Sequence, residues 1–389
     1  MDVLTRNNRL FATYMMTLLY AFHYGIPMYA ASTFLSQVFG APFTSVIYMI
    51  AGFLTLAISL HITKYLKHFH TYSFTMGIVV SQIIITFALG LTNNNFLLGL
   101  FFVMHFILAA LIFTCLNVFL ENFSTNNHTG QIRGVFFTLF NLGFLVSPFL
   151  GGALLAKSGY TALFTVSASL LLPFVFFMHH YLKKVKDHRF LSVNLFSAFK
   201  KAWKNIDTRG ALLSVILLEC FFAMTVIYLP LYIVSLGIPL TTYLTAVLPI
   251  ALIPLVIMPY ELGIIADTKL GEKELMILGL LILTMTAFAI SIVTSSNILV
   301  WIIILITSRI GAALVETMSY TYYFKKINGS DVDLTTLFSN IRNFGLAITA
   351  LFGIILSPLI AMYPTIMFVM LGIILLWGIT QVLHIKDTL

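Results

Sequence analysis

Residues 132–152 read IRGVFFTLFNLGFLVSPFLGG and contain one charged side chain, that of Arg133. An α-helix rises about 1.5 Å per residue, so a helix of this length spans about 30 Å, the thickness of the hydrocarbon core of a bilayer. The segment also carries Gly143, Pro148, Gly151 and Gly152, and Gly and Pro are more frequent in membrane helices than in soluble ones. We therefore predict that this segment is a membrane-spanning helix.

The rest of the chain has the same apolar character. Of its 389 residues, 60% are hydrophobic and 9% are charged, and the mean hydropathy is +1.02. Soluble domains carry about 25% charged residues, so a water-soluble core could not hold this much apolar surface. In lipid, backbone N–H and C=O groups must pair internally, which leaves helices or closed barrels. The apolar runs far exceed the barrel-strand length of about ten residues, so we predict an all-α integral membrane protein.

A second segment repeats the pattern of the first. Residues 341–361 read IRNFGLAITALFGIILSPLIA, and both segments begin with Ile-Arg and reach Gly-x-x-x-Ser-Pro. This places each copy as the fifth span of its half, as a duplicated six-helix unit requires. We accordingly predict twelve transmembrane helices in two pseudo-symmetric six-helix bundles, residues 1–182 and 208–389. Between them, residues 183–207 form a basic cytoplasmic linker that includes an amphipathic helix on the membrane surface.

Basic side chains fall on one side of this pattern. The chain has 21 Lys and Arg against 13 Asp and Glu, a net charge of +8. All the Lys and Arg except Lys157 and Arg309 lie on the same face of the predicted spans, which identifies the cytoplasmic face. We predict an inner-membrane protein with both termini in the cytoplasm, and the positive charge then implies no nucleic-acid partner. Cys115 and Cys220 lie in apolar runs, so neither a disulfide framework nor a metal or cofactor site is expected.

Three local motifs add a family resemblance. Residues 263–273, GIIADTKLGEK, follow the eighth predicted span; residues 143–152, GFLVSPFLGG, lie in the fifth; and residues 308–317, SRIGAALVET, lie in the tenth. Together with twelve spans and a long basic central loop, they resemble the major facilitator superfamily, and in particular its drug/proton antiporters. The corresponding loop of the first half, residues 60–70, reads LHITKYLKHFH and lacks the Gly and Asp of the motif.

The resemblance implies roles for two groups of residues. A cytoplasmic gate would involve Gly263, Asp267, Gly271 and Lys273, with the Asp267 carboxylate facing the N-terminus of the fifth span, where unpaired N–H groups attract an anion. The second group would allow close helix approach and a bend in the fifth span, as in exporters, and consists of Gly143, Pro148, Gly151 and Gly152. Plain helix packing without a directional role remains the alternative both for this second group and for Asp267.

Ionisable side chains inside the spans are the candidate substrate and proton-coupling residues. Glu219 lies near the middle of the seventh span and Arg309 near the middle of the tenth, with Glu316 two turns further on the same face. His23 and His105 lie near the middle of the first and fourth spans. An intramembrane charge costs a few kcal/mol or more unless it is paired or hydrated, so each is a functional candidate.

The roles of these residues stay open at this stage. Glu219 is the candidate coupling acid. Arg309 either binds a substrate anion or neutralises Glu219 or Glu316. Glu316 is either a second coupling acid or only the partner of Arg309. For the two histidines we favour hydrogen-bonded packing over a role in transport. The resemblance implies that the first, fourth, seventh and tenth spans line a central cavity.

These observations predict a secondary active transporter rather than an enzyme. We expect a monomeric, proton-coupled exporter of a small molecule that works by alternating access in the lipid bilayer. The alternatives are a proton-coupled uptake symporter for a sugar or organic acid, and a membrane scaffold without transport. The sequence contains no paired nucleophile and base, no metal-ligand cluster and no phosphate-binding loop, which argues against an enzyme.

Overall fold

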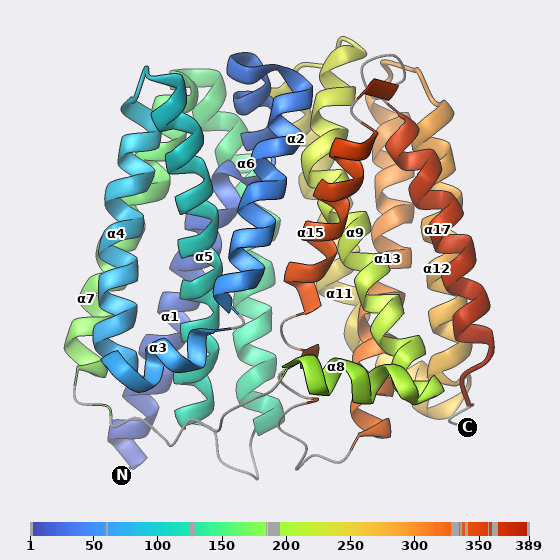
Figure 1. Ribbon diagram of the computed structural model, residues 1–389, viewed down its shortest axis with the longest axis horizontal. Helices are drawn as coiled ribbons and strands as arrows, with labels where there is room; N and C mark the ends of the chain where they lie inside the picture. Colours follow the sequence, from blue (N-terminus) through green and yellow to red (C-terminus); the bar gives the residue numbers. More distant parts are fainter. Residues whose placement is uncertain are drawn as a thin grey trace. The chain divides into compact units, whose positions relative to one another are not determined.

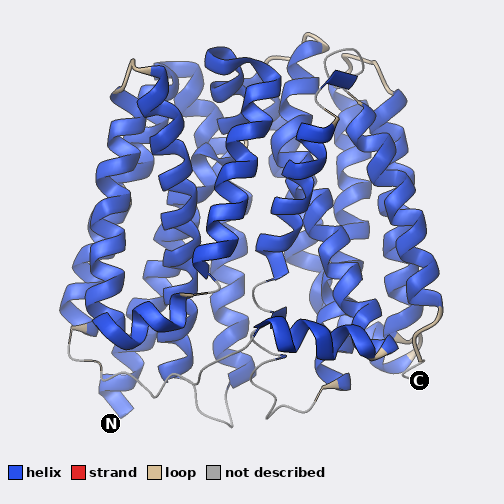
Figure 2. Cartoon of the chain, in the orientation of Figure 1, coloured by secondary structure: helices blue, strands red, loops and turns tan. Residues whose placement is uncertain are grey.

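A computed structural model of the chain describes residues 3–59, 61–123, 129–183, 185, 195–327, 334, 337–338, 341–356, 358–359 and 365–386. Within this part every regular element is a helix, as Figure 2 shows, which confirms the all-α class. The main helices, labelled in Figure 1, are α1 (Val3–Met28), α2 (Ala31–Ser59), α3 (Ile62–Phe69), α4 (Thr71–Leu91), α5 (Asn95–Phe123), α6 (Thr129–Ser169), α7 (Leu171–Leu182), α8 (Leu195–Lys204), α9 (Ile206–Ser235), α10 (Leu240–Thr242), the π-helical turn η1 (Tyr243–Val247), α11 (Leu248–Thr268), α12 (Glu272–Ile292), α13 (Ile298–Lys326), α15 (Ile341–Ile355) and α17 (Ile366–Leu383).

The helices group into two compact units. Unit 1 comprises Met1–Phe39 and Phe53–Ser192, and unit 2 comprises Gly40–Gly52 and Val193–Leu389. Part of α2 thus groups with unit 2, whereas the predicted division keeps all of residues 1–182 together. The predicted bundle boundaries stay a prediction.

Nine helical runs in the described part are long and apolar enough to cross a membrane. Two of them, Asn7–Ser59 with 53 residues and Ile132–Leu182 with 51, are each more than twice the length of about 20 residues that one crossing needs. The chain is therefore a multi-pass membrane protein. The total of twelve spans stays a prediction, because much of residues 328–364 lies outside the described residues.

Two of the predicted turns are reduced to single glycines. Gly40, with φ 75°, and Gly159, with φ 71°, each interrupt an otherwise continuous run of helix. A positive φ is strained for residues with a Cβ, so a glycine allows the chain to turn there in one residue. The first predicted span, residues 9–37, is in contrast broken at Tyr29–Ala30, where the Ala30 N–H donates to the Pro27 carbonyl at 3.0 Å.

Two short amphipathic helices accompany the long ones. The sequence predicts a loop over residues 60–70. The structure has the helix α3 there, and its aromatic side chains Tyr65 and Phe69 are exposed. The amphipathic helix predicted in the linker is α8; Phe199 and Trp203 stack on it at 5.2 Å between ring centroids, and its lysines are exposed. Both lie across the long helices of their own unit in Figure 1. Residues 186–194 of the linker lie outside the described residues.

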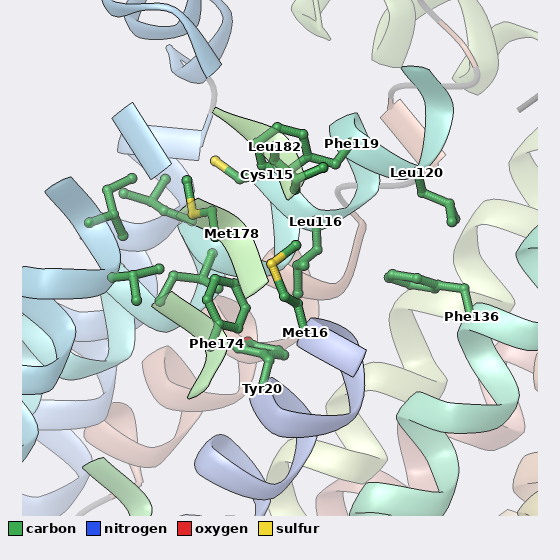
Figure 3. Packing of buried hydrophobic residues seen from close by; sticks show 14 of the residues in the cluster. Met16, Tyr20, Cys115, Leu116, Phe119, Leu120, Phe136, Phe174, Met178 and Leu182 are labelled. Atoms are coloured by element: carbon green, nitrogen blue, oxygen red, sulfur yellow. The ribbon is translucent and has the colours of Figure 1, made fainter. Parts of the chain in front are cut away.

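The core of unit 1 is formed where α1, α4, α5, α6 and α7 meet. Figure 3 shows part of this cluster, which includes aliphatic, aromatic and sulfur side chains on different helices: Met16, Tyr20, Cys115, Leu116, Phe119, Phe136, Phe174 and Met178. Both Cys115 and Cys220 are buried free thiols. Such packing fixes the rotation of each helix about its own axis. It therefore also fixes the direction in which the few polar side chains of that helix point.

The core of unit 2 is organised around α9. In its most apolar 18-residue window, 89% of the residues are buried inside the protein, against 33% for α4. A helix that is apolar all round belongs in a core rather than at a surface. The helices α13, α15 and α17 pack against α9, so a polar side chain on α13 can reach α9 directly.

Candidate functional site

The two predicted histidines lie in one buried cluster of unit 1. His23 of α1 and His105 of α5 have ring centroids 5.6 Å apart, and the amide nitrogen of Gln82 on α4 lies 2.9 Å from Nε2 of His23 and 2.9 Å from Nδ1 of His105. His23 and Gln82 are fully buried and His105 is 4% exposed. The structure thus brings together two residues that the sequence could only place at similar depth, and it adds Gln82 as the link between them.

Further polar groups of unit 1 complete this cluster. Nδ1 of His23 lies 2.9 Å from the carbonyl oxygen of Ser167 on α6, and the Ser167 hydroxyl donates to the His23 carbonyl at 2.6 Å. The Thr86 hydroxyl lies 3.0 Å from Nδ1 of His105. Buried polar groups are costly without partners, and here four helices supply them. The cluster is therefore a built hydrogen-bond network rather than an accidental contact.

In unit 2 the buried ionisable side chain is that of Arg309, on α13. Its side chain is 1% exposed and points to α9, where Nη2 donates to the Thr225 hydroxyl at 3.2 Å. The guanidinium carbon lies 5.8 Å from the ring centroid of Phe221 and 5.4 Å from that of Phe222. Nε and Nη1 have no hydrogen-bond partner among the described residues. The guanidinium thus contacts two aromatic rings and one hydroxyl, and the N–H donors of Nε and Nη1 are not used by the described residues.

The two predicted acids lie on the same helices as this guanidinium and its partner. Glu219 is partly buried on α9, where Gly345 of α15 packs against its Cβ and backbone. Glu219 is six residues from Thr225, about 9 Å along the helix axis. Glu316 is partly buried on α13, two turns from Arg309. The Arg309 hydrogen bond goes to neutral Thr225 and not to either acid.

The residues of the predicted gate lie at the α11–α12 connection. Gly263 is in α11, Gly271 precedes α12 in an extended conformation with ψ 164°, and Lys273 is partly buried in the first turn of α12. The Asp267 side chain lies outside the described residues, so its contact with the N-terminus of another helix stays a prediction.

The motif also contains Glu272, which the sequence analysis did not single out. Glu272 is fully buried and forms an ion pair with Lys325 of α13.

The glycine-rich motif of α6 packs against α1. A Cβ on Gly143 would meet the Ala21 side chain, and a Cβ on Gly151 would meet the Ile26 carbonyl oxygen. Pro148 and Gly152 are buried in the same stretch of α6. The motif therefore allows the two backbones to approach closely, as small residues do in membrane helix pairs. A role in transport direction stays a proposal.

Neutral side chains are what sequence reasoning missed in both units: Gln82, Thr86, Ser167 and Thr225. Hydroxyl groups in apolar helices can bond to their own backbone, so their presence gives little signal. Gln82 gave a stronger signal, because a side-chain amide in the middle of an apolar run needs hydrogen-bond partners. The position of Gln82 in the sequence, however, does not say which helix supplies those partners.

The family model of the Major Facilitator Superfamily matches residues 93–348, well over half of the chain. Several long apolar helices in one chain define a class, the polytopic α-helical membrane proteins. With this match the chain belongs to the Major Facilitator Superfamily. No curated protein sequence matches the chain.

Solved structures share the fold at low sequence identity. A bacterial homologue of the human lysosomal transporter Spinster aligns with a TM-score of 0.72 and 12% identity over 98% of this chain and 96% of its own. An auto-inhibited peptide transporter of the POT family gives 0.76 and 10% over 96% of each chain. The nucleoside transporter NupG gives 0.72 and 13% over 96% of this chain and 99% of its own. Membership of this superfamily makes the chain a membrane transporter, and the solved structures show that it shares their fold.

Proposed function

We propose that the protein is a proton-coupled secondary transporter that exports a small molecule with an anionic group by alternating access. The observation that carries the substrate class is the buried guanidinium of Arg309, in which two nitrogens have no hydrogen-bond partner among the described residues. A buried charge costs several kcal/mol unless a partner compensates it. A carboxylate or phosphate of the substrate would supply that partner and accept in the bidentate geometry that guanidinium groups favour.

The ionisable groups near Arg309 support proton coupling. Glu219 and Glu316 share α9 and α13 with the proposed anion site, and each is partly buried. A carboxyl group that takes up a proton changes the charge near Arg309, and this change would couple proton binding to binding of the anion. We assign Glu219 as the coupling acid and Glu316 as a second acid or a partner of the site. Proton movement and substrate movement would then occur in one cycle.

The direction of transport is proposed from the α6 motif. Gly143, Pro148, Gly151 and Gly152 follow the pattern that the exporter resemblance implies, and their packing against α1 is compatible with it. The free donors of Arg309 favour a second candidate, an uptake symporter for an organic acid. We propose a monomer, since one chain carries both units, and an inner-membrane location with cytoplasmic termini, supported by the distribution of Lys and Arg.

Reconstituted protein tests the proposal. Proteoliposomes with a trapped pH dye are exposed to a panel of carboxylates, phosphates, sugars and cationic drugs, with gradients in both directions. We expect proton movement that depends on an anionic compound and is lost in Glu219→Gln but kept in Glu261→Gln, an exposed acid on α11. Coupled movement that survives Glu219→Gln removes the coupling assignment. A panel without any response favours the scaffold, and a response only to cations contradicts the substrate class.

A further inference from the structure

Donors and acceptors do not match in the histidine cluster. The Gln82 amide nitrogen has two hydrogens and both are used, one on each ring. Nδ1 of His105 has a single lone pair, yet the Gln82 amide at 2.9 Å and the Thr86 hydroxyl at 3.0 Å both approach it. In contrast, Oε1 of Gln82 is buried and has no hydrogen-bond partner among the described residues. One acceptor is therefore shared by two donors while another has none.

The hydrogen bonds also determine where the ring hydrogens are. The Ser167 carbonyl can only accept, so Nδ1 of His23 carries a hydrogen and Nε2 presents its lone pair to Gln82. His105 presents the lone pair of Nδ1 to Gln82, so its hydrogen is on Nε2. Each ring then has one hydrogen, and the pair is neutral.

A rotation of the Gln82 amide by about 180° turns Oε1 toward both rings, and this orientation requires an added proton, because Oε1 then needs an N–H from each ring. His23 provides one by gaining a proton on Nε2, while Nδ1 continues to donate to Ser167. His105 provides the other by exchanging its hydrogen from Nε2 to Nδ1, where the Thr86 oxygen also accepts it. The ring hydrogens rise from two to three, so one proton enters and His23 becomes an imidazolium.

We propose that His23, Gln82 and His105 form a binding site for a single proton, in which the orientation of the Gln82 amide reports whether the site is occupied. The two rings do not titrate independently, because one amide oxygen serves both. The link to transport rests on the proton coupling proposed above, but binding of the proton to this cluster does not.

The surroundings contain few groups that could compete for this proton. The rings contact Gln82 and Thr86 of α4, Ser167 of α6 and the aromatic ring of Tyr24 on α1, at 6.4 Å from His105. Tyr20 of α1 donates to the backbone of Ala109.

Other ionisable groups on the packed helices lie further along them. Arg9 is fourteen residues from His23 on α1, Glu121 is sixteen residues from His105 on α5, and Lys157 is ten residues from Ser167 on α6, which places them about 15 to 24 Å away along the helix axes. Arg133 of α6 is further still. On α7, His179 bonds to Tyr72, ten residues from Gln82, with His180, Tyr181 and Lys183 beyond it.

Histidine-selective nitrogen-15 NMR of the full-length protein in nanodiscs tests the inference. Spectra are recorded from about pH 8, through the range in which histidines usually titrate, down to the lowest pH at which the protein keeps its native thermal transition, and His23→Asn and His105→Asn assign the two signals. We expect both rings to change at one common midpoint, His23 to the doubly protonated form and His105 from the Nε2–H to the Nδ1–H tautomer. Two silent rings, two imidazolium rings, or a His105 that keeps its tautomer would overturn the proposal.

Two substitutions of Gln82 change the coupling in opposite ways. Gln82→Met keeps the length without the amide, so the common midpoint should be lost. Gln82→Glu keeps the shape and accepts from both rings, so His23 should stay doubly protonated over the whole range. The exposed His61 and His180 are internal controls that neither variant should shift. A common midpoint in Gln82→Met, or a neutral His23 in Gln82→Glu, contradicts the proposal, and Gln82→Glu decides alone if Gln82→Met does not accumulate.

Transport and proton binding are separated by comparing the two assays. If the proteoliposomes move substrate without protons while the two rings titrate together, the proposed coupling is wrong and the proton site stands. If protons move with substrate while both rings stay silent, the coupling stands and this site is wrong.

Discussion

The histidine pair of unit 1 and Arg309 of unit 2 are both buried among apolar helices, but they differ in how their polar atoms are satisfied. Nδ1 and Nε2 of His23 and Nδ1 of His105 are bonded to side chains or backbone of two other helices, α4 and α6. Arg309 has one hydrogen bond and two ring contacts, and two of its nitrogens have no partner among the described residues. The first cluster is neutral and nearly complete, whereas the second is charged and incomplete.

The difference has an energetic consequence. A hydrogen-bonded neutral network contributes to stability, and removing one member leaves the others without partners. An isolated buried charge is a cost to the folded state, which a transporter can retain only for function. In the functions proposed above, the histidine cluster is part of the structural frame and also binds a proton, whereas Arg309 is an anion site that lowers the stability of the protein until it is occupied.

The largest expected effect comes from removing the guanidinium. Arg309→Met should lower anion transport about 100-fold or more, because each charge-assisted hydrogen bond to the substrate contributes about 1.5–3 kcal/mol. Initial rates of substrate counterflow in proteoliposomes measure this loss. Thr307→Val, an exposed position on the same helix, is the control and should transport normally. Retained transport in Arg309→Met would remove the anion site.

The next effect tests whether the histidine cluster depends on the α1–α6 contact. Gly151→Leu should destabilise the protein by about 1–3 kcal/mol, because the new side chain meets the backbone carbonyl of Ile26. Gly134→Leu on the same helix has open space and should have little effect. Thermal unfolding in nanodiscs measures both. Equal midpoints for the two variants would mean that α1 and α6 are not closely packed.

A smaller effect is expected within the histidine cluster itself. Ser167→Ala removes the hydroxyl that donates to the His23 carbonyl, and a hydrogen bond of this kind contributes about 1 kcal/mol. The matched control is Ser169→Ala, whose hydroxyl bonds only to the backbone of its own helix. The thermal midpoint should fall more in Ser167→Ala than in the control, and the reverse order would contradict the network.

The smallest expected effect concerns the aromatic face under Arg309. Phe222→Leu removes one of two ring contacts, at 5.4 Å from the ring centroid, near the outer limit of about 6 Å for such contacts, so we expect a loss of about 0.5 kcal/mol. We expect a modest fall in thermal stability in wild-type background and no fall in the Arg309→Met background. Double-mutant cycles on the thermal midpoint measure the coupling, and additive effects would mean that the ring does not hold the guanidinium.

Hydropathy predicted the helical, multi-pass architecture well, because lipid imposes a minimum length and an apolar composition on every span. The orientation and the span number inferred from the charges stay predictions. The all-α class and the multi-pass topology follow from residues such as those of segment 132–152. Short interruptions of the helices were harder to predict. The turns at Gly40 and Gly159 can be located, because glycine marks a turn in the sequence. The break at Tyr29–Ala30 and the helix α3 depend on local hydrogen bonds and packing, which the sequence does not show.

The site was predictable only in part. A polar residue deep in an apolar run gives its depth along the helix, which identified His23, His105 and Arg309. The depth of a residue along its helix does not tell which other helix faces it. The link between the histidines through Gln82 and the contact between Arg309 and Thr225 could therefore not be deduced from the sequence. Glu272 escaped notice because it starts a helix next to a loop, where acids are common, yet tertiary packing buries it against Lys325.

The contrast between the two clusters is tested most directly by comparing the thermal unfolding of Arg309→Met and Gln82→Met in the same nanodiscs without substrate. We predict opposite signs. Arg309→Met should raise the midpoint, since the desolvation cost of a buried charge with few partners is removed; replacing buried charged groups by well-packed apolar ones stabilises some proteins by about 1–4 kcal/mol. Gln82→Met should lower it, since both rings lose a donor at a cost of about 1–3 kcal/mol. A fall in both variants would show that Arg309 is a structural residue and would contradict the assignment of an unfilled anion site.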